Sequence, residues 1–184
     1  MSPSPRIQAA ISSLLVIDLQ ARLLPAIEQG GEVIAHTVWL MQIARQLGVP
    51  TVLTEQYPRG LGPTAPQILA EAEGAHHVEK ICFSSHSESR LTDTAVADRS
   101  QVVVCGTEAH VCVLQTVLDL KAVGKSVFVV EEGIGSRQAR DKALAIARMR
   151  AHGIEIVSRE MVAFEWLERA GTEVFRSISK NFIR

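Results

Sequence analysis

The feature that most constrains the fold of this chain is an alternation of short β-branched runs with longer amphipathic stretches. Four runs are strongly apolar and two are weaker: 14–18, 50–55, 100–107 and 125–132, then 76–81 and 154–158. Strands buried on both faces of a parallel sheet have such continuous apolar runs. Helices are predicted over 31–47, 110–123 and 137–151, and the glycines at 48, 124 and 153 provide their stops.

Each parallel crossover needs a connection of helical length, so the alternation predicts an α/β fold. We expect a Rossmann-like three-layer α/β/α sandwich with a six-stranded, mainly parallel sheet. The chain has 184 residues, of which 47% are hydrophobic, enough for one domain over 1–184 with its own core. Only residues 1–10 and the last few positions are predicted to be loose.

Charge and cysteine usage limit the classes of partner. Nineteen basic residues against twenty acidic ones argue against nucleic acid, and no apolar stretch is long enough to cross a membrane. The basic positions within 137–150 are predicted to form a solvated helix face, with an acidic partner as the alternative. Cys82, Cys105 and Cys112 form no CxxC pair, which favours reduced thiols and a cytoplasmic location.

The stretch 110–123 is apolar on nearly every side, more than contact with one sheet face requires. A subunit interface would bury the apolar side chains that the sheet does not cover. This pattern therefore predicts a homo-oligomer, either a dimer or a tetramer.

Ligands of open parallel sheets bind beyond the carboxyl ends of the strands. Asp18, Glu55 and Lys80 end the first three predicted strands, and Cys112 begins the helix after the fourth. A helix N-terminus and a neighbouring ammonium would favour a thiolate, and Asp18 could move the proton. The alternatives stay open, since such residues also serve as a core thiol, a cap and a surface lysine. Cys82 and Cys105 are expected to be structural.

Three segments, VIDLQ at 16–20, VEKICFS at 78–84 and VVCGTEAHVCVLQT at 103–116, resemble the isochorismatase-like cysteine hydrolases, a superfamily that includes nicotinamidases. The segments at 54–64, 80–84, 105–112 and 143–150 are most similar to the isochorismatase domain-containing proteins. The resemblance implies a catalytic triad of Asp18, Lys80 and Cys112. It also implies an oxyanion hole from the backbone N–H groups of Glu108 and Cys112, with a cis peptide before Glu108.

The chemistry that this resemblance implies is hydrolysis of a small amide, imide, ester or carbamoyl compound through a thioester on cysteine. Gln20, Tyr57 and Phe83 are predicted to bind the substrate. His110, two residues before the predicted nucleophile, either contacts substrate or faces solvent.

The metal ligands of nicotinamidases are missing from the stretch after the second strand, which contains no histidine. His76 and His77 are adjacent and would point to opposite faces of a strand. We therefore expect no metal and no cofactor. Three alternatives remain open: a non-catalytic oligomeric binding or regulatory module on the same fold, a metal-assisted nicotinamidase-type amidase, and a redox-sensing thiol.

Overall fold

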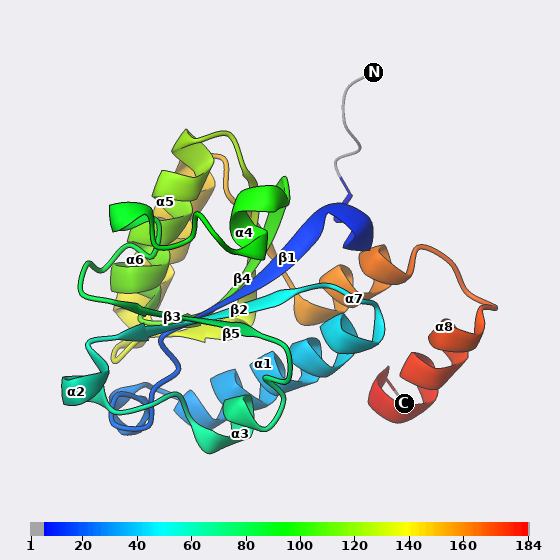
Figure 1. Cartoon of the computed structure of the whole chain (residues 1–184), viewed down its shortest axis with the longest axis horizontal. Coiled ribbons are helices and arrows are strands. Elements are labelled where there is room, and N and C mark those ends of the chain that lie inside the picture. The colour runs from blue at the N-terminus through cyan, green and yellow to red at the C-terminus, as the bar shows by residue number, and fades with distance from the viewer. Residues whose placement is uncertain (1–5, 184) are drawn as a thin grey trace.

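The computed structural model describes residues 6–183. Its centre is a sheet of β1 (Ser12–Ile17), β2 (Thr51–Gln56), β3 (His76–Lys80), β4 (Gln101–Thr107), β5 (Ser126–Gly135) and β6 (Glu155–Val157) (Figure 1). The strand order is β3-β2-β1-β4-β5-β6, and every neighbouring pair is parallel. The predicted six-stranded sheet is thereby confirmed, and all of it is parallel.

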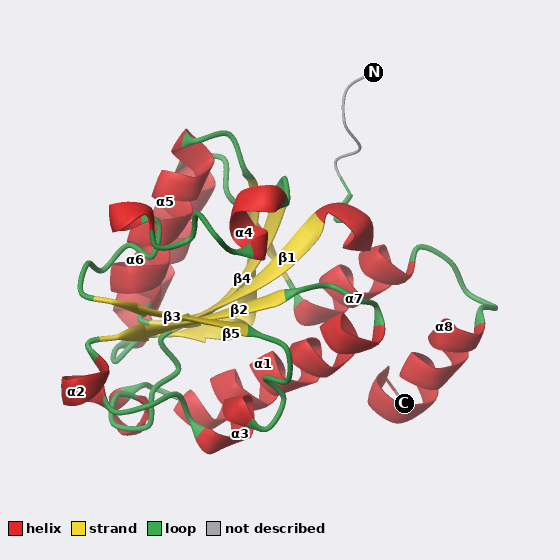
Figure 2. Ribbon diagram, in the orientation of Figure 1, coloured by secondary structure: helices red, strands yellow, loops and turns green. Residues whose placement is uncertain are grey.

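Helices cover both faces of the sheet, so the predicted three layers are also confirmed (Figure 2). One face carries α1 (Gly30–Gln46), α3 (Pro66–Leu69) and α7 (Arg159–Leu167), and the other carries α4 (Ala95–Asp98), α5 (Leu114–Ala122) and α6 (Ala139–Ala151). Two further short helices are α2 (Pro58–Leu61) and α8 (Glu173–Ile178).

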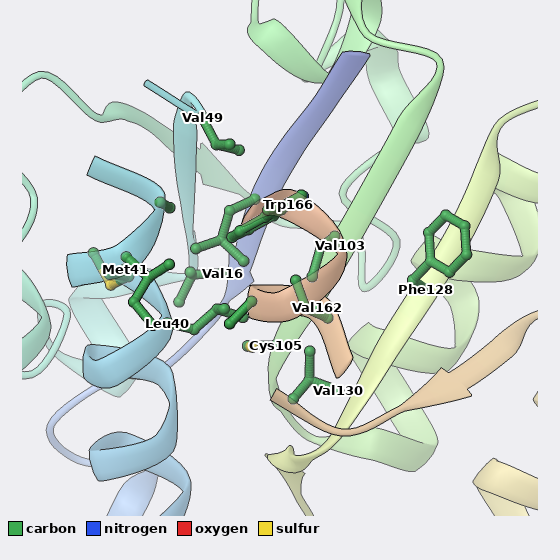
Figure 3. Close-up of a cluster of buried hydrophobic side chains, with 14 of the residues drawn as sticks. Val16, Leu40, Met41, Val49, Val103, Cys105, Phe128, Val130, Val162 and Trp166 are labelled. Carbon is green, nitrogen blue, oxygen red and sulfur yellow. The ribbon is translucent and has the colours of Figure 1, made fainter. Parts of the chain in front are cut away.

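Successive side chains of one strand enter different cores. Val16 of β1 packs with α1 and α7, whereas its neighbours Leu15 and Ile17 pack on the opposite face. Figure 3 shows the first of these cores, where strand residues such as Val103 and Val130 meet Leu40, Met41, Val162 and Trp166. This two-sided burial explains why the strand sequences are apolar without alternation. Cys105 belongs to this core and is fully buried, as a packing residue would be.

The predicted helices form with shifted bounds. The stretch 110–123 is a π-helical turn, Ala109–Val113, followed by α5. The two C-terminal helices had no counterpart in the sequence prediction. Both begin with a side-chain cap: the hydroxyl oxygens of Ser158 and Thr172 accept hydrogen bonds from the backbone N–H groups of Met161 and Phe175.

The apolar surplus of 110–123 is used within the chain. Leu114, Val117 and Leu120 are buried in the core formed with α4 and α6, and Val123 is the one large apolar residue of this stretch that is mostly exposed. The structural premise of the predicted oligomer is therefore wrong. The surplus exists because the helix contacts both the sheet and neighbouring helices.

The predicted loose segment 1–10 is only partly described, because residues 1–5 lie outside the described part of the chain. Ile7 is buried, and its N–H donates to Glu165. The N–H of Gln8 donates to the Gln101 side chain at 2.7 Å. Ile7 and Gln8 are thus packed against the fold. No helix within 6–183 has both the length and the apolar character needed to cross a membrane.

The end of β4 packs so closely against β1 that only glycine fits there. Gly106 has φ of +134°, and a Cβ at this position would lie 2.1 Å from the carbonyl oxygen of Ile17. Gly124 also has a positive φ, of +88°, but nothing lies within 4 Å of its virtual Cβ. Substitution of the two glycines therefore distinguishes the cost of backbone strain from the cost of steric overlap.

We expect Gly106→Ala to lower the free energy of unfolding by at least about 3 kcal/mol, because the methyl group forces β1 and β4 apart. Gly124→Ala should cost only about 1 kcal/mol, the strain of a positive φ alone. Chemical denaturation of the two variants measures the difference. Equal losses of stability would contradict the close approach at Gly106.

Candidate active site

Asp18 lies directly after β1, beside the point where the strand order reverses, and its carboxylate is fully buried. Its Oδ1 accepts a hydrogen bond from the Thr54 hydroxyl at 2.6 Å, and its Oδ2 accepts one from Lys80 Nζ at 2.7 Å. The Thr107 hydroxyl donates to the Asp18 carbonyl oxygen at 2.8 Å. The carboxylate and its backbone are thus fixed by β2, β3 and β4 together.

Lys80 ends β3, two strands away from β1, and its side chain is also fully buried. Its ammonium donates to Asp18 Oδ2 at 2.7 Å, Gln56 Oε1 at 2.6 Å and the carbonyl oxygen of Phe83 at 3.1 Å. An ammonium has three N–H donors, and each has an acceptor here. Such complete pairing is what a buried charge requires, because desolvation costs several kcal/mol per ion.

Cys112 lies in the π-helical turn before α5. Its carbonyl oxygen accepts a hydrogen bond from the Thr116 hydroxyl at 2.6 Å, and the same hydroxyl oxygen accepts one from the N–H of Ser85 at 2.9 Å. Ser84 donates to Asp119 of α5 at 2.6 Å. These bonds tie the segment that follows Lys80 to the helix that carries Cys112.

The thiol of Cys112 lies close enough to Asp18 and Lys80 for both to affect its pKa. This pKa is raised to about 12: burial makes the largest contribution, the Asp18 carboxylate adds to it, and Lys80 opposes both. The expectation of a favoured thiolate is therefore wrong in direction. Burial of the sulfur is the main physical reason, and the Lys80 charge does not offset it because it is already paired with Asp18 at 2.7 Å.

A cavity of about 330 Å³ opens beside this group of residues. Its apolar lining consists of Leu23, Ala26, Leu61, Phe83 and Val111, and its polar lining of Asp18, Gln56, Glu108, Cys112 and Arg137. Arg137 Nε donates to Glu108 Oε2 at 2.8 Å. The contact raises the pKa of the Arg137 guanidinium, first through the hydrogen bond and then through the carboxylate charge. Each charged lining residue thus has a partner of opposite charge.

The structure brings together five of the sequence-predicted site residues: Asp18, Lys80, Glu108 and Cys112, with Phe83 in the cavity wall. The peptide bond between Thr107 and Glu108 is cis, as the resemblance implied.

Two predicted substrate residues lie elsewhere. Gln20 is fully buried, and its amide bonds the backbone of Gln56 and Gly62 instead of lining the cavity. Tyr57 is 51% exposed and is absent from the lining, because the chain turns away at the end of β2 with a φ of +38°.

Two polar lining residues, Gln56 and Arg137, were not predicted from the sequence, and neither were the apolar lining residues other than Phe83. The rule of strand carboxyl ends could have found Gln56, since β2 ends one residue later than predicted. Glu55 was chosen there instead, and its carboxylate accepts hydrogen bonds from the N–H and hydroxyl of Thr64. Arg137 offered no comparable signal.

The other candidate residues do not join this site. His76 and His77 are exposed on β3, the edge strand. Among residues 6–183, no three His, Cys, Asp or Glu side chains are placed to hold a metal ion. His110 Nδ1 is 2.9 Å from the Ser136 hydroxyl oxygen. All three cysteines are free, and burial raises the pKa of Cys105 to about 12.

A buried carboxylate, ammonium and thiol at the carboxyl ends of a parallel sheet define an α/β protein with the residues for nucleophilic catalysis. Comparison with known proteins specifies the class. The Isochorismatase domain pattern matches residues 12–161, and the chain belongs to this family, as the sequence motifs indicated. Isochorismatase domain-containing protein 2 of Danio rerio is 35% identical over 176 residues, 95% of this chain and 88% of its own.

Two solved structures resemble the fold over nearly its whole length. One, described as the MAR1 ribonuclease of Caenorhabditis elegans, is 33% identical with a TM-score of 0.91, covering 97% of this chain and 93% of its own. The other, described as an octameric hydrolase of unknown specificity from Escherichia coli, has a TM-score of 0.89 over 100% of this chain and 93% of its own. At 22% identity the second shows likeness of fold alone.

We expect the alkylation rate of Cys112 by iodoacetamide to rise about tenfold per pH unit from pH 7 to beyond pH 9. Only the thiolate reacts, and a pKa raised to about 12 leaves the thiol protonated over that whole range. Peptide mass mapping at each pH measures the rate, with Cys112→Ser as the blank. A rate that levels off below pH 8 would contradict the buried neutral thiol.

Proposed function

We propose that this chain is a cysteine hydrolase that cleaves a small amide, imide, ester or carbamoyl compound through a thioester intermediate. The observation that carries the proposal is the contact of one thiol, Cys112, with a fully buried carboxylate–ammonium pair at the wall of a cavity. A buried ion pair is costly and contributes little to stability by itself. Its placement against a thiol in a cavity favours a catalytic role.

In the proposed reaction, the Cys112 proton moves to Asp18 as the sulfur attacks the carbonyl carbon of the substrate. The negative charge on the former carbonyl oxygen is stabilised by the backbone N–H groups of Glu108 and Cys112. The C–N or C–O bond then breaks, and Asp18 returns the proton to the leaving amine or alcohol. Asp18 next takes a proton from water, whose oxygen attacks the thioester, and the acid product leaves as the proton returns to sulfur.

Lys80 has a different task in this scheme. Its three N–H groups already have acceptors, so it stabilises the charge of Asp18 and does not act as a proton donor. The cavity supports an uncharged substrate, because its charged lining residues are paired and half of its lining residues are apolar. Its volume of about 330 Å³ lies at the small end for ligand sites.

The test is a panel of small amides, imides, esters and carbamoyl compounds, assayed at high protein concentration. We expect turnover of at least one compound, and a loss of at least about 10³-fold in Cys112→Ser because the nucleophile is gone. Asp18→Asn should lose a similar factor through blocked proton transfer. Cys82→Ser is the matched control, since Cys82 lies outside the cavity lining, and it should retain activity.

Equal residual activity in wild type and Cys112→Ser would reject the hydrolase and favour the alternative of a binding or regulatory module. Activity removed by EDTA and restored by a divalent metal would instead favour a nicotinamidase-type amidase. RNA belongs in the panel because of the description of the C. elegans structure. Cleavage of RNA that survives Cys112→Ser would also contradict the proposal.

We also propose that the chain forms a homo-oligomer in the cytoplasm. The three free cysteines support a reducing compartment. Self-association is supported by exposed apolar side chains at the carboxyl ends of β2 and β3, where Tyr57, Ile81 and Phe83 are each more than half exposed. The fold relative from E. coli is described as octameric.

Sedimentation at micromolar concentration should give a particle of at least two 20.0 kDa subunits. Ile81, 63% exposed and absent from the cavity lining, provides a test of the surface. We expect Ile81→Glu to weaken the association by placing a charge in the contact, while Leu144→Glu on α6 leaves it unchanged. A monomer in the wild type would contradict the proposal.

A further inference from the structure

Gln56 ends β2 and is paired in register with Lys80 of β3. Its side-chain Oε1 accepts a hydrogen bond from Lys80 Nζ at 2.6 Å, and its Nε2 donates to the carbonyl oxygen of Ile81 at 2.5 Å. The amide can have only this orientation, because a flip would place NH₂ against the ammonium and oxygen against a carbonyl. Gln56 therefore presents a fixed neutral acceptor to Lys80.

A second buried amide holds Gln56 in place. Gln20 Oε1 accepts from the N–H of Gln56 at 2.8 Å, and Gln20 Nε2 donates to the carbonyl oxygens of Gln56 at 3.0 Å and Gly62 at 2.7 Å. The Gln20 side chain is fully buried and all its hydrogen-bonding groups are engaged except one lone pair. The position of Gln56 is thus set by the backbone, independently of any ligand in the cavity.

The consequence concerns the direction of one proton of Lys80. A buried ammonium whose N–H group loses its acceptor turns toward another one, because an unpaired buried donor is costly. Cys112 lines the same cavity as Gln56, and its thiol lies close enough to Lys80 for the ammonium to lower the thiol pKa. Without the Gln56 carbonyl, the Cys112 sulfur is the acceptor available to that proton.

We propose that Gln56 is a positioning residue. It accepts the hydrogen bond of the Lys80 N–H group that would otherwise point at Cys112. Lys80 thereby stays hydrogen-bonded to Asp18 and not to the thiol, and Asp18 remains the group that accepts the thiol proton. The catalytic meaning of this arrangement rests on the proposed function, but the arrangement itself can be tested on the thiol without a substrate.

The other charged groups around Cys112 are accounted for. Glu108 and Arg137 face the cavity as a pair joined at 2.8 Å. His110 precedes Cys112 in the same helical turn and is bound to Ser136, with Asp141 at 3.9 Å. Variants at Gln56 leave all these groups in place, so a change in thiol reactivity reports on Lys80.

The experiment compares two variants that act on Lys80 in opposite ways. Gln56→Met keeps the size of the side chain but removes the acceptor, so the freed N–H should stabilise the Cys112 thiolate. Gln56→Glu keeps the acceptor but adds a negative charge that opposes the thiolate. The readout is the pH at which iodoacetamide alkylates Cys112 at a fixed rate, measured by peptide mass mapping on the full chain.

We expect this pH to fall by about one unit in Gln56→Met and to rise by about one unit in Gln56→Glu. Gln46→Met, at an exposed position near the end of α1, is the matched control and should leave it unchanged. Thermal unfolding of each variant establishes that the fold is intact. If one variant fails to fold, the other still has a predicted sign.

An unchanged or higher alkylation pH in Gln56→Met would overturn the proposal, because loss of an acceptor with a purely structural role frees no N–H group for the thiolate. Gln56→Glu shows that a charge at this position reaches the thiol, and an unchanged alkylation pH in this variant would also overturn the proposal. The result is independent of the panel assay. A chain that hydrolyses nothing can still show the opposite displacements, and an active hydrolase can lack them.

Discussion

The buried ion pair between Asp18 and Lys80 is the interaction on which the site depends. Both side chains are fully excluded from solvent, and taking two such charges out of water costs several kcal/mol per ion. The cost is offset only by complete hydrogen bonding. Thr54 satisfies the other carboxylate oxygen, and Gln56 and the Phe83 carbonyl satisfy the ammonium. Three strands, β1, β2 and β3, and the segment after β3 must therefore be in place together for the pair to be fully hydrogen-bonded.

The same pair also affects the protonation of Cys112, the proposed nucleophile. An isolated lysine beside a cysteine would draw the thiol toward its anion, as the sequence suggested. Here the lysine is hydrogen-bonded to the carboxylate at 2.7 Å, and burial dominates the result by raising the pKa of Cys112. In the proposed reaction, the attack by sulfur is therefore coupled to proton transfer toward Asp18. This site differs in that respect from one with a preformed thiolate.

Much of the fold followed from the sequence because the sheet is buried on both faces. Runs such as 100–107 have no alternation, so their strand character and parallel pairing were predictable. The helices α7 and α8 were missed because a Ser or Thr cap carries most of their signal, without a long periodic pattern. The prediction that 110–123 forms a subunit interface lost its structural premise, because the sequence does not show whether a helix packs on the sheet alone or on other helices as well.

The candidate site was predictable in its chemistry and less so in its surroundings. Asp18, Lys80 and Cys112 each sit at a strand end or helix start, so the topology alone brings them to one rim. Gln20 does not line the cavity, because its buried amide bonds the backbone of the neighbouring strand instead. Gln56 was missed by a shift of one residue in the end of β2, which in a strand exchanges one face for the other.

In the proposed reaction, an acyl group is carried by the sulfur of Cys112. The most direct measurement is rapid acid quenching of the protein with a small activated ester, such as p-nitrophenyl acetate, followed by peptide mass mapping. We expect a transient acetyl group on the peptide that contains Cys112, formed faster than on any other peptide and absent in Cys112→Ser. Ester cleavage with no acyl group on Cys112, or with the acyl group on Cys82 instead, would contradict it.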